Sequence, residues 1–198
     1  KSWDEEKPSH NGIVCYQLHN RYVLSHLKTG LLIIDQQRAH QRILYERYLE
    51  VLEKQQAQCQ QKLFPETLEF SPADAQLLGL SLDALNKLGF DLRYFGQHTF
   101  VVHGIPAGTE DIDCKRLLEN MLDDMRHEQE LKNEPAEHFA RLLARHTAIK
   151  PGQTLAESEM RALVDSLFAT SLPYAAPDGK PTMITYSIED LDKRFKRQ

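Results

Sequence analysis

Residues 31–46 read LLIIDQQRAHQRILYE, an apolar run that ends at Asp35 and gives way to a polar stretch. The apolar run is typical of a short buried strand. After Asp35 the apolar residues follow a helical period, with Leu44 and Tyr48 four positions apart, which predicts a helix over about residues 37–54. A carboxylate at such a junction receives free N–H groups and the positive end of the helix. Asp35 is therefore either a helix cap or a candidate metal ligand.

Two more β-prone runs precede this junction. Residues 13–18 and 22–27 have strand-forming composition, and turn-like residues separate them from each other and from residues 31–34. The three runs predict a meander that leads directly into the helix.

The middle of the chain has its own pattern of strands and helices. Residues 62–70, KLFPETLEF, combine alternation with a proline and predict an edge strand. Ser71 before a proline predicts a helix start, residues 90–103 predict a hairpin, and Asp113 can cap another helix. Residues 58–133 thus read as strand, helix, hairpin and helix, and we expect a separate subdomain.

The C-terminal part returns to helices and one strand. Pro135 begins a helix, and residues 154–157, TLAE, read as a capping box for a following helix with an apolar stripe. Residues 183–188 predict a strand, and residues 189–195 predict a short terminal helix.

These elements predict an α+β fold with two subdomains. Residues 12–57 and 134–198 would form one subdomain of sheet and helices, and residues 58–133 an external α/β subdomain inserted into it. Residues 1–11 are polar and end in a turn, and we expect them to be a linker remnant.

Composition narrows the classes of function. The formal net charge of -5 argues against a general nucleic-acid-binding surface, because phosphate contacts rely on clustered Lys and Arg. The three cysteines are far apart in sequence, which fits free thiols in a reducing compartment. No apolar run approaches the roughly 20 residues that cross a bilayer. We therefore expect a cytoplasmic protein, without membrane association and with weak or indirect DNA contact.

Three segments occur in an order that resembles a known family. Asp35-Gln36 is followed by Ala-His, Arg and Tyr-Glu, residues 95–107 read FGQHTFVVHGIPA, and residues 177–182 read PDGKPT. Over about residues 12–196 this order closely resembles the C-terminal domain of the MutL family of DNA mismatch repair proteins. The resemblance implies a homodimerisation domain that joins two ATPase heads, with ATP bound only in an N-terminal domain outside this chain. It also implies the mismatch-recognition protein MutS and a sliding clamp as partners.

Nicking members of that family carry the motif DQHA, two residues, Glu, four residues, Glu. Gln37, Arg38 and Gln41 stand where the motif has His, Ala and the first Glu. The positions that match are Asp35, Gln36, Ala39, His40, Arg42, Tyr45 and Glu46.

Two later motifs are also altered. Ala144-Arg145 stands where nicking members have Ala-Cys, and residues 176–181 stand where they have CPHGRP, with Ala176 for Cys and Asp178 for His. Zinc sites use thiolate, imidazole and carboxylate groups, which glutamine, alanine and arginine do not replace. Zinc is therefore not expected. Asp35, Glu46 and Asp178 remain as oxygen ligands of the type that suits Mg²⁺ or Mn²⁺.

Two hypotheses follow from this altered motif. In the first, the domain dimerises and organises repair partners without cutting DNA and needs no cofactor of its own. In the second, it is a metal-dependent nicking endonuclease that uses the degenerate motif, with His146 as a further candidate. The residues of that motif are Asp35, His40, Glu46 and Asp178.

Residues 60–65, QQKLFP, resemble the short sliding-clamp-binding motif of the family, in which glutamine precedes an apolar pair and proline. An apolar pair of this kind fills a hydrophobic groove while the glutamine bonds at its rim. The candidate contact residues are Gln60, Leu63, Phe64 and Pro65. The alternative is an edge strand with Leu63 and Phe64 partly in the core.

The predicted meander has more sheet surface than one small subdomain can cover. Together with the family resemblance, this predicts an isologous two-fold interface on the sheet. The alternative is a monomer in which flanking helices cover the sheet completely.

Overall fold

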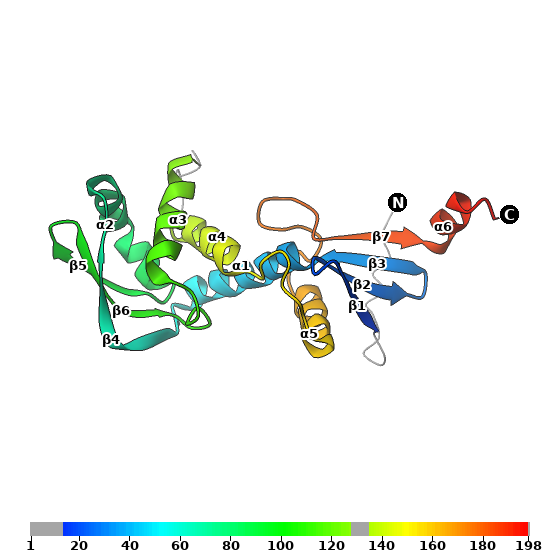
Figure 1. Ribbon diagram of the computed structural model, residues 1–198, viewed down its shortest axis with the longest axis horizontal. Helices are drawn as coiled ribbons and strands as arrows, with labels where there is room; N and C mark the ends of the chain where they lie inside the picture. Colours follow the sequence, from blue (N-terminus) through cyan, green and yellow to red (C-terminus); the bar gives the residue numbers. More distant parts are fainter. Residues whose placement is uncertain (1–13, 128–134, 198) are drawn as a thin grey trace. The chain divides into compact units, whose positions relative to one another are not determined.

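The computed structural model describes residues 14–127 and 135–197 (Figure 1), so the expected linker at residues 1–11 lies outside the described residues. None of the described helices is both long and apolar enough to cross a membrane. The elements are β1 (Cys15–Leu18), β2 (Tyr22–Leu27), β3 (Gly30–Asp35), α1 (Gln36–Lys54), β4 (Cys59–Glu69), α2 (Pro72–Lys87), β5 (Asp91–Gly96), β6 (Thr99–Pro106), α3 (Cys114–His127), α4 (Pro135–Thr147), α5 (Glu157–Phe168), β7 (Met183–Ser187) and α6 (Ile188–Arg194).

The chain forms two compact units. We call Lys1–Leu44 with Ala148–Gln198 the terminal unit and Tyr45–Thr147 the central unit. Mixed helices and antiparallel sheets confirm the predicted α+β class. The central unit contains the segment predicted as an inserted subdomain, residues 58–133, and also takes in α4 and the C-terminal part of α1. The dimerising and regulatory roles of the subdomains stay predictions.

The terminal unit is built on a four-stranded antiparallel sheet in the order β1-β2-β3-β7. The predicted meander is confirmed as β1, β2 and β3, and β7 joins it beside β3, with Leu32 opposite Thr185. Gly30 permits this approach, because a Cβ atom there would lie 2.0 Å from the carbonyl oxygen of Tyr186.

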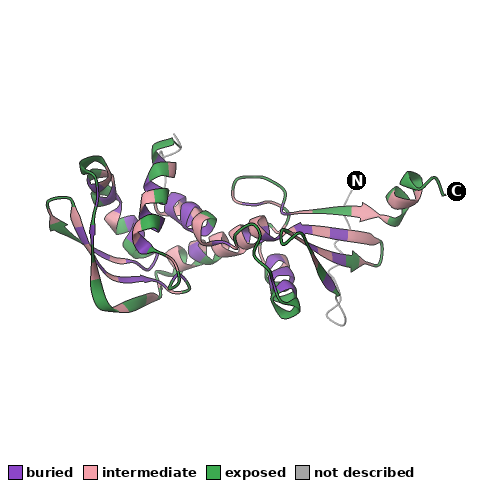
Figure 2. Ribbon diagram, in the orientation of Figure 1, coloured by how far each residue is buried: buried purple, intermediate pink, exposed green. Residues whose placement is uncertain are grey.

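One face of this sheet, the inner face, packs against α5. Alternate residues of the strands point into this core, as the two-residue period of a strand requires. The buried residues of strands and helix appear in purple in Figure 2. The core residues of the inner face and α5 are Cys15, Val23, Leu32, Ile34, Met160, Leu163, Val164 and Leu167.

The opposite face, which we call the outer face, is apolar and largely open. Tyr16, Leu24, Ile33 and Ile184 lie opposite one another in a row across all four strands. Tyr16 is 66% exposed and Ile184 is 48% exposed, whereas Leu24 and Ile33 are half-buried. The described residues therefore leave an apolar strip exposed along this row.

Helix α5, which packs against the inner face of this sheet, begins later along the chain than the sequence predicts. The predicted capping box of Thr154 and Glu157 is wrong: the N-cap of α5 is Ala156, whose N–H donates to Glu159 Oε2 at 2.6 Å. Leu155 is buried, and its N–H donates to Gln17 Oε1 at 3.2 Å. This contact with β1 holds the chain extended, so the helix starts two residues beyond the expected position.

The central unit contains a three-stranded antiparallel sheet in the order β4-β6-β5, in which β4 is an edge strand as predicted. Local signals are confirmed here. Ser71 Oγ accepts the N–H of Asp74 at 3.2 Å to cap α2, and Asp113 Oδ1 accepts the N–H of Arg116 at 2.9 Å to cap α3.

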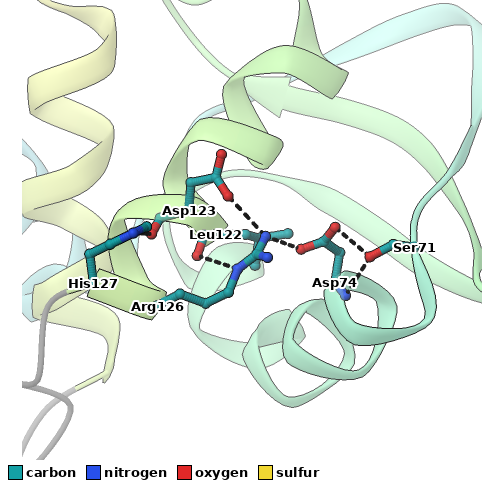
Figure 3. Close-up of polar contacts among 6 residues, drawn as sticks. All are labelled: Ser71, Asp74, Leu122, Asp123, Arg126 and His127. Carbon is teal, nitrogen blue, oxygen red and sulfur yellow. Dashed lines mark hydrogen bonds and ion pairs between the residues drawn. The ribbon is translucent and has the colours of Figure 1, made fainter.

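Arg126, near the end of α3, joins two helices of the central unit (Figure 3). Its guanidinium pairs with Asp74 in the first turn of α2 and with Asp123 of its own helix at 3.0 Å. The hydroxyl of Ser71 donates to Asp74 at 2.6 Å. The capped start of α2 is thereby tied to the end of α3.

Candidate functional site

The junction of β3 and α1 places Asp35 as a helix cap. Its Oδ1 atom accepts the N–H groups of Gln37 and Arg38, both at 3.1 Å. The backbone N–H of Asp35 donates to the carbonyl of Thr182 at 2.9 Å, so the segment that leads into β7 lies beside it. Capping of this kind stabilises a helix by about 0.5 to 2 kcal/mol. One oxygen of this carboxylate is therefore committed to the backbone of α1.

The second oxygen of Asp35 faces an arginine. Arg38 Nε lies 3.7 Å from Asp35 Oδ2, and Arg38 Nη1 donates to the carbonyl of Pro181 at 3.2 Å. The side chain of Asp35 is 15% exposed. A guanidinium from the first turn of α1 thus joins the end of β3 to the loop before β7.

That loop, residues 176–181, is folded on itself. Ala176, at the position of the family's Cys, is buried; its N–H donates to the carbonyl of Lys180 at 2.8 Å, and its carbonyl accepts the N–H of Gly179 at 2.9 Å. Arg42 Nε of α1 donates to the carbonyl of Ala175 at 2.6 Å. Two arginines of α1 therefore bracket this loop: Arg38 contacts Pro181 at its end, and Arg42 contacts Ala175 just before it.

Asp178, the candidate ligand in the loop, pairs with its own neighbour. Its carboxylate accepts the N–H of Lys180 at 3.2 Å and lies 2.8 Å from Lys180 Nζ. Partial burial acts to raise the pKa of Asp178, but the hydrogen bonds from Lys180 and the positive charges of Lys180 and Arg38 outweigh it and hold the pKa below its usual value. The carboxylate is ionised and already neutralised by side chains.

His40 does not offer a free nitrogen lone pair. Its Nδ1 atom accepts the backbone N–H of Ile149 at 3.0 Å. Burial lowers the pKa of His40, so the ring is neutral near pH 7, and the acceptor role of Nδ1 places the proton on Nε2. His40 therefore holds the segment that follows α4.

Gln36, the second residue of the degenerate motif, is fully buried in an amide network. Its Oε1 accepts from Gln17 Nε2 at 2.7 Å, and its Nε2 donates to the carbonyls of Asn20 and Gln153 at 2.8 and 3.0 Å. The network joins β1, the β1–β2 turn, the start of α1 and the segment before α5. Sequence reasoning matched Gln36 to the motif but did not identify this structural role.

The other candidates lie in the central unit. Glu46 is on α1, and His146 near the end of α4 lies 2.8 Å from Asp124 Oδ2 of α3, with Arg145 Nη1 at 3.3 Å from the same oxygen. Within residues 14–127 and 135–197, no three His, Cys, Asp or Glu side chains form a group that could hold a metal ion.

Protein donors already bond to atoms of the candidate ligand set. Asp35 Oδ1, His40 Nδ1 and Asp178 Oδ1 each accept a backbone N–H, and the side chain of Ala176 has no ligand atom. The cysteine of the terminal unit, Cys15, is buried in the inner-face core, and burial raises its pKa. A metal would therefore have to displace existing hydrogen bonds and ion pairs.

The clamp-like residues lie on β4. The register of β4 against β6 shifts between Gln61 and Glu66, and within this irregular stretch Leu63 is 88% exposed and Phe64 is 79% exposed. Lys62 Nζ contacts Glu66 Oε2 at 2.5 Å across the shift. Gln60 and Pro65 are exposed as well. The apolar pair projects from the strand edge instead of entering the core.

The terminal unit thus combines an exposed apolar row on a four-stranded sheet with a helix junction whose polar atoms bond within the fold. Residues 15–155 match the family described as the MutL C terminal dimerisation domain. The chain belongs to this family.

Similar proteins agree with this assignment. The chain is 44% identical over 183 residues to the DNA mismatch repair protein MutL of Chloroherpeton thalassium, covering 92% of this chain and 29% of that protein. It is 39% identical over 198 residues to MutL of Prosthecochloris aestuarii, covering 98% and 32%. The chain thus spans about a third of the length of these relatives.

Replacement of Gln36 by leucine tests its structural role. We expect the free energy of unfolding to fall by about 0.5 to 1.5 kcal/mol, because the hydrogen bonds of the buried Gln36 amide to its partly exposed partners are lost while side-chain volume is retained. Urea unfolding followed by circular dichroism measures the change. Gln37→Leu is the control, since the Gln37 side chain takes no part in the network. Equal stability of the two variants would contradict this role.

Proposed function

We propose that this chain is the homodimerising domain of a DNA mismatch repair protein and that it assembles repair partners without cutting DNA. The relatives it matches are each described as a DNA mismatch repair protein MutL. In the whole protein, ATP binding belongs to the N-terminal domain, and MutS and a sliding clamp are the partners. Three free cysteines fit a cytoplasmic location.

The outer face of the sheet carries the dimer proposal. A row of apolar side chains crosses all four strands, and Tyr16, Leu18 and Ile184 remain 43% to 66% exposed. Transfer of such surface out of water is favourable by about 25 cal/mol per Å². A two-fold axis that lies between two such sheets and parallel to them would cover this face with the same face of a second copy, so both faces would be buried at once.

Substitution on the outer face should separate the copies. The chain at micromolar concentration should sediment at about 46 kDa, twice its mass of 22.9 kDa. Ile184→Asp should shift the equilibrium towards the monomer by at least roughly tenfold, because it places a charge within the buried row. Sedimentation equilibrium reports both masses.

Thr185→Asp is the matched control for that substitution. Thr185 is the next residue of β7, is also exposed and points to the opposite side of the sheet, so its dimer should persist. A monomeric parent chain would contradict the proposal that the outer face is the dimer interface. An Ile184→Asp variant that is as dimeric as the control would contradict it as well.

The absence of nuclease chemistry is supported by the state of the donor atoms. Asp35 caps α1, His40 accepts a backbone N–H, and Asp178 pairs with Lys180. Catalysis by a metal requires open ligands that hold the ion and position its bound water. These side chains instead complete bonds within the fold.

Incubation of supercoiled plasmid with the full-length protein and Mn²⁺ tests this part of the proposal. We expect nicking no faster than in the absence of protein. Metal-dependent nicking that disappears in an Asp35→Asn variant of the full-length protein would instead establish the alternative, an endonuclease with altered ligands. Asn at this position retains a capping oxygen, so loss of nicking in that variant would not reflect loss of the helix start.

Recruitment of a sliding clamp is supported by the projection of Leu63 and Phe64 from β4. Two adjacent apolar side chains at this exposure are available to a groove, and the exposed residues Gln60 and Pro65 flank them along β4. Edge strands also present unpaired backbone groups that extended-peptide recognition uses.

Titration of the chain against a sliding clamp measures this interaction. Leu63→Ala with Phe64→Ala should weaken binding by at least roughly tenfold, because the anchors of such a contact are its apolar pair. A control pair, Leu80→Ala with Phe95→Ala, removes side chains that are 81% and 77% exposed and should leave affinity unchanged. Equal affinity of the two double variants for the clamp would contradict the assignment of residues 60–65 as a clamp-binding motif.

A further inference from the structure

Arg38 contacts oxygen atoms of two segments that carry candidate metal ligands, the end of β3 and the 176–181 loop. Its guanidinium faces Asp35 Oδ2 at 3.7 Å and bonds to the carbonyl oxygen of Pro181 at 3.2 Å. Its positive charge also acts on the carboxylate of Asp178. All of these groups belong to the terminal unit. One cationic side chain therefore contacts a carboxylate and a carbonyl from segments more than a hundred residues apart, and its charge acts on a second carboxylate.

The chemistry of these oxygens explains why a guanidinium suits them. Carboxylate and carbonyl oxygens are the ligands of hard divalent cations such as Mg²⁺ and Mn²⁺. A guanidinium is always charged and presents several N–H donors in one plane, so it bonds to the same oxygens without requiring a coordination sphere. Arg38 stands where the family motif has alanine, a residue without charge or donor.

We propose that Arg38 is an internal cation that joins the end of β3 to the 176–181 loop and takes the place of a divalent metal ion there. Asp35 and the Pro181 carbonyl are its contacts, and its charge also acts on Asp178, which pairs directly with Lys180. Metal binding and the Arg38 contacts are then mutually exclusive. This inference deepens the proposed loss of nuclease chemistry, but it does not rest on dimerisation or on clamp binding.

An ordinary surface ion pair is the competing explanation. Asp35 and Arg38 are three residues apart on one helix start, and exposed pairs of this kind contribute little. The bond from Arg38 to Pro181 is different, because it links α1 to a loop 143 positions away in sequence. An internal cation should control access of metal to the carboxylates, whereas a surface pair should not.

Arg38→Gln in the full chain removes the charge and retains a polar side chain. We expect the parent chain to bind Mn²⁺ no better than solvent-exposed carboxylates do, with a melting temperature that millimolar Mn²⁺ leaves unchanged. The variant should melt lower, recover part of the loss when Mn²⁺ is added, and bind Mn²⁺ roughly tenfold more tightly. Electron paramagnetic resonance of free Mn²⁺ reports binding directly.

Three further variants complete the test. Arg38→Lys should still exclude Mn²⁺, because it retains the positive charge; it also keeps the test decisive if Arg38→Gln does not fold, since tight Mn²⁺ binding by Arg38→Lys would overturn the proposal. Arg38→Gln with Asp35→Asn should lose the gain in Mn²⁺ affinity. Arg161→Ala, which removes an ion pair with Glu157 on α5, should leave Mn²⁺ affinity at the parent value.

Besides tight Mn²⁺ binding by Arg38→Lys, two results would overturn the internal-cation role. One is tight Mn²⁺ binding by the parent chain, and the other is an Arg38→Gln variant that resembles Arg161→Ala in both melting temperature and Mn²⁺ affinity. Neither result bears on sedimentation of the dimer, and a monomeric parent chain would leave the Mn²⁺ measurements interpretable.

Discussion

The pairing of β7 with β3 is the constraint on which the junction depends. These strands come from opposite ends of the chain, and their antiparallel register sets Ile34 opposite Met183. Thr182, just before β7, therefore accepts the N–H of Asp35, and the 176–181 loop lies within reach of the first turns of α1. Without this pairing the β3–α1 junction would end in unpaired backbone groups, which are costly when buried.

The polar groups at the β3–α1 junction bond in two independent sets. The neutral part centres on Gln36. The buried amide of this side chain forms hydrogen bonds with β1, with the β1–β2 turn and with the segment before α5. A charged part centres on Asp35 and Arg38 and reaches the loop before β7. The neutral part has a fully buried centre in Gln36, although its partners are partly or fully exposed, so the hydrogen bonds of Gln36 itself are the more costly ones to lose. The charged part is partly exposed, so its ion pair contributes less to stability.

Local signals in the sequence predicted most of the elements. Periodicity located the meander and α1, and the caps at Ser71 and Asp113 bond as expected. What sequence patterns missed depends on contacts between distant segments. The start of α5 moved because Gln17 binds the N–H of Leu155, and the contact of Arg38 with Pro181 exists only once β7 lies beside β3. Contacts of this kind cannot be predicted from residue spacing or from secondary-structure propensity.

Charge balance explains why retained carboxylates do not by themselves indicate a metal. Asp35 is largely removed from water, where a nearby cation stabilises its charge, whereas Asp178 is exposed and pairs with Lys180 at the surface. A divalent ion is one solution, and a set of basic side chains is another. Here Arg38 and Lys180 supply the positive charge, and the neutral ring of His40 is used to bind the backbone. The negative charges of the carboxylates are already balanced by these basic side chains. A metal ion would have to displace them, and the free energy of that displacement would reduce its affinity. This favours a structural role for the junction.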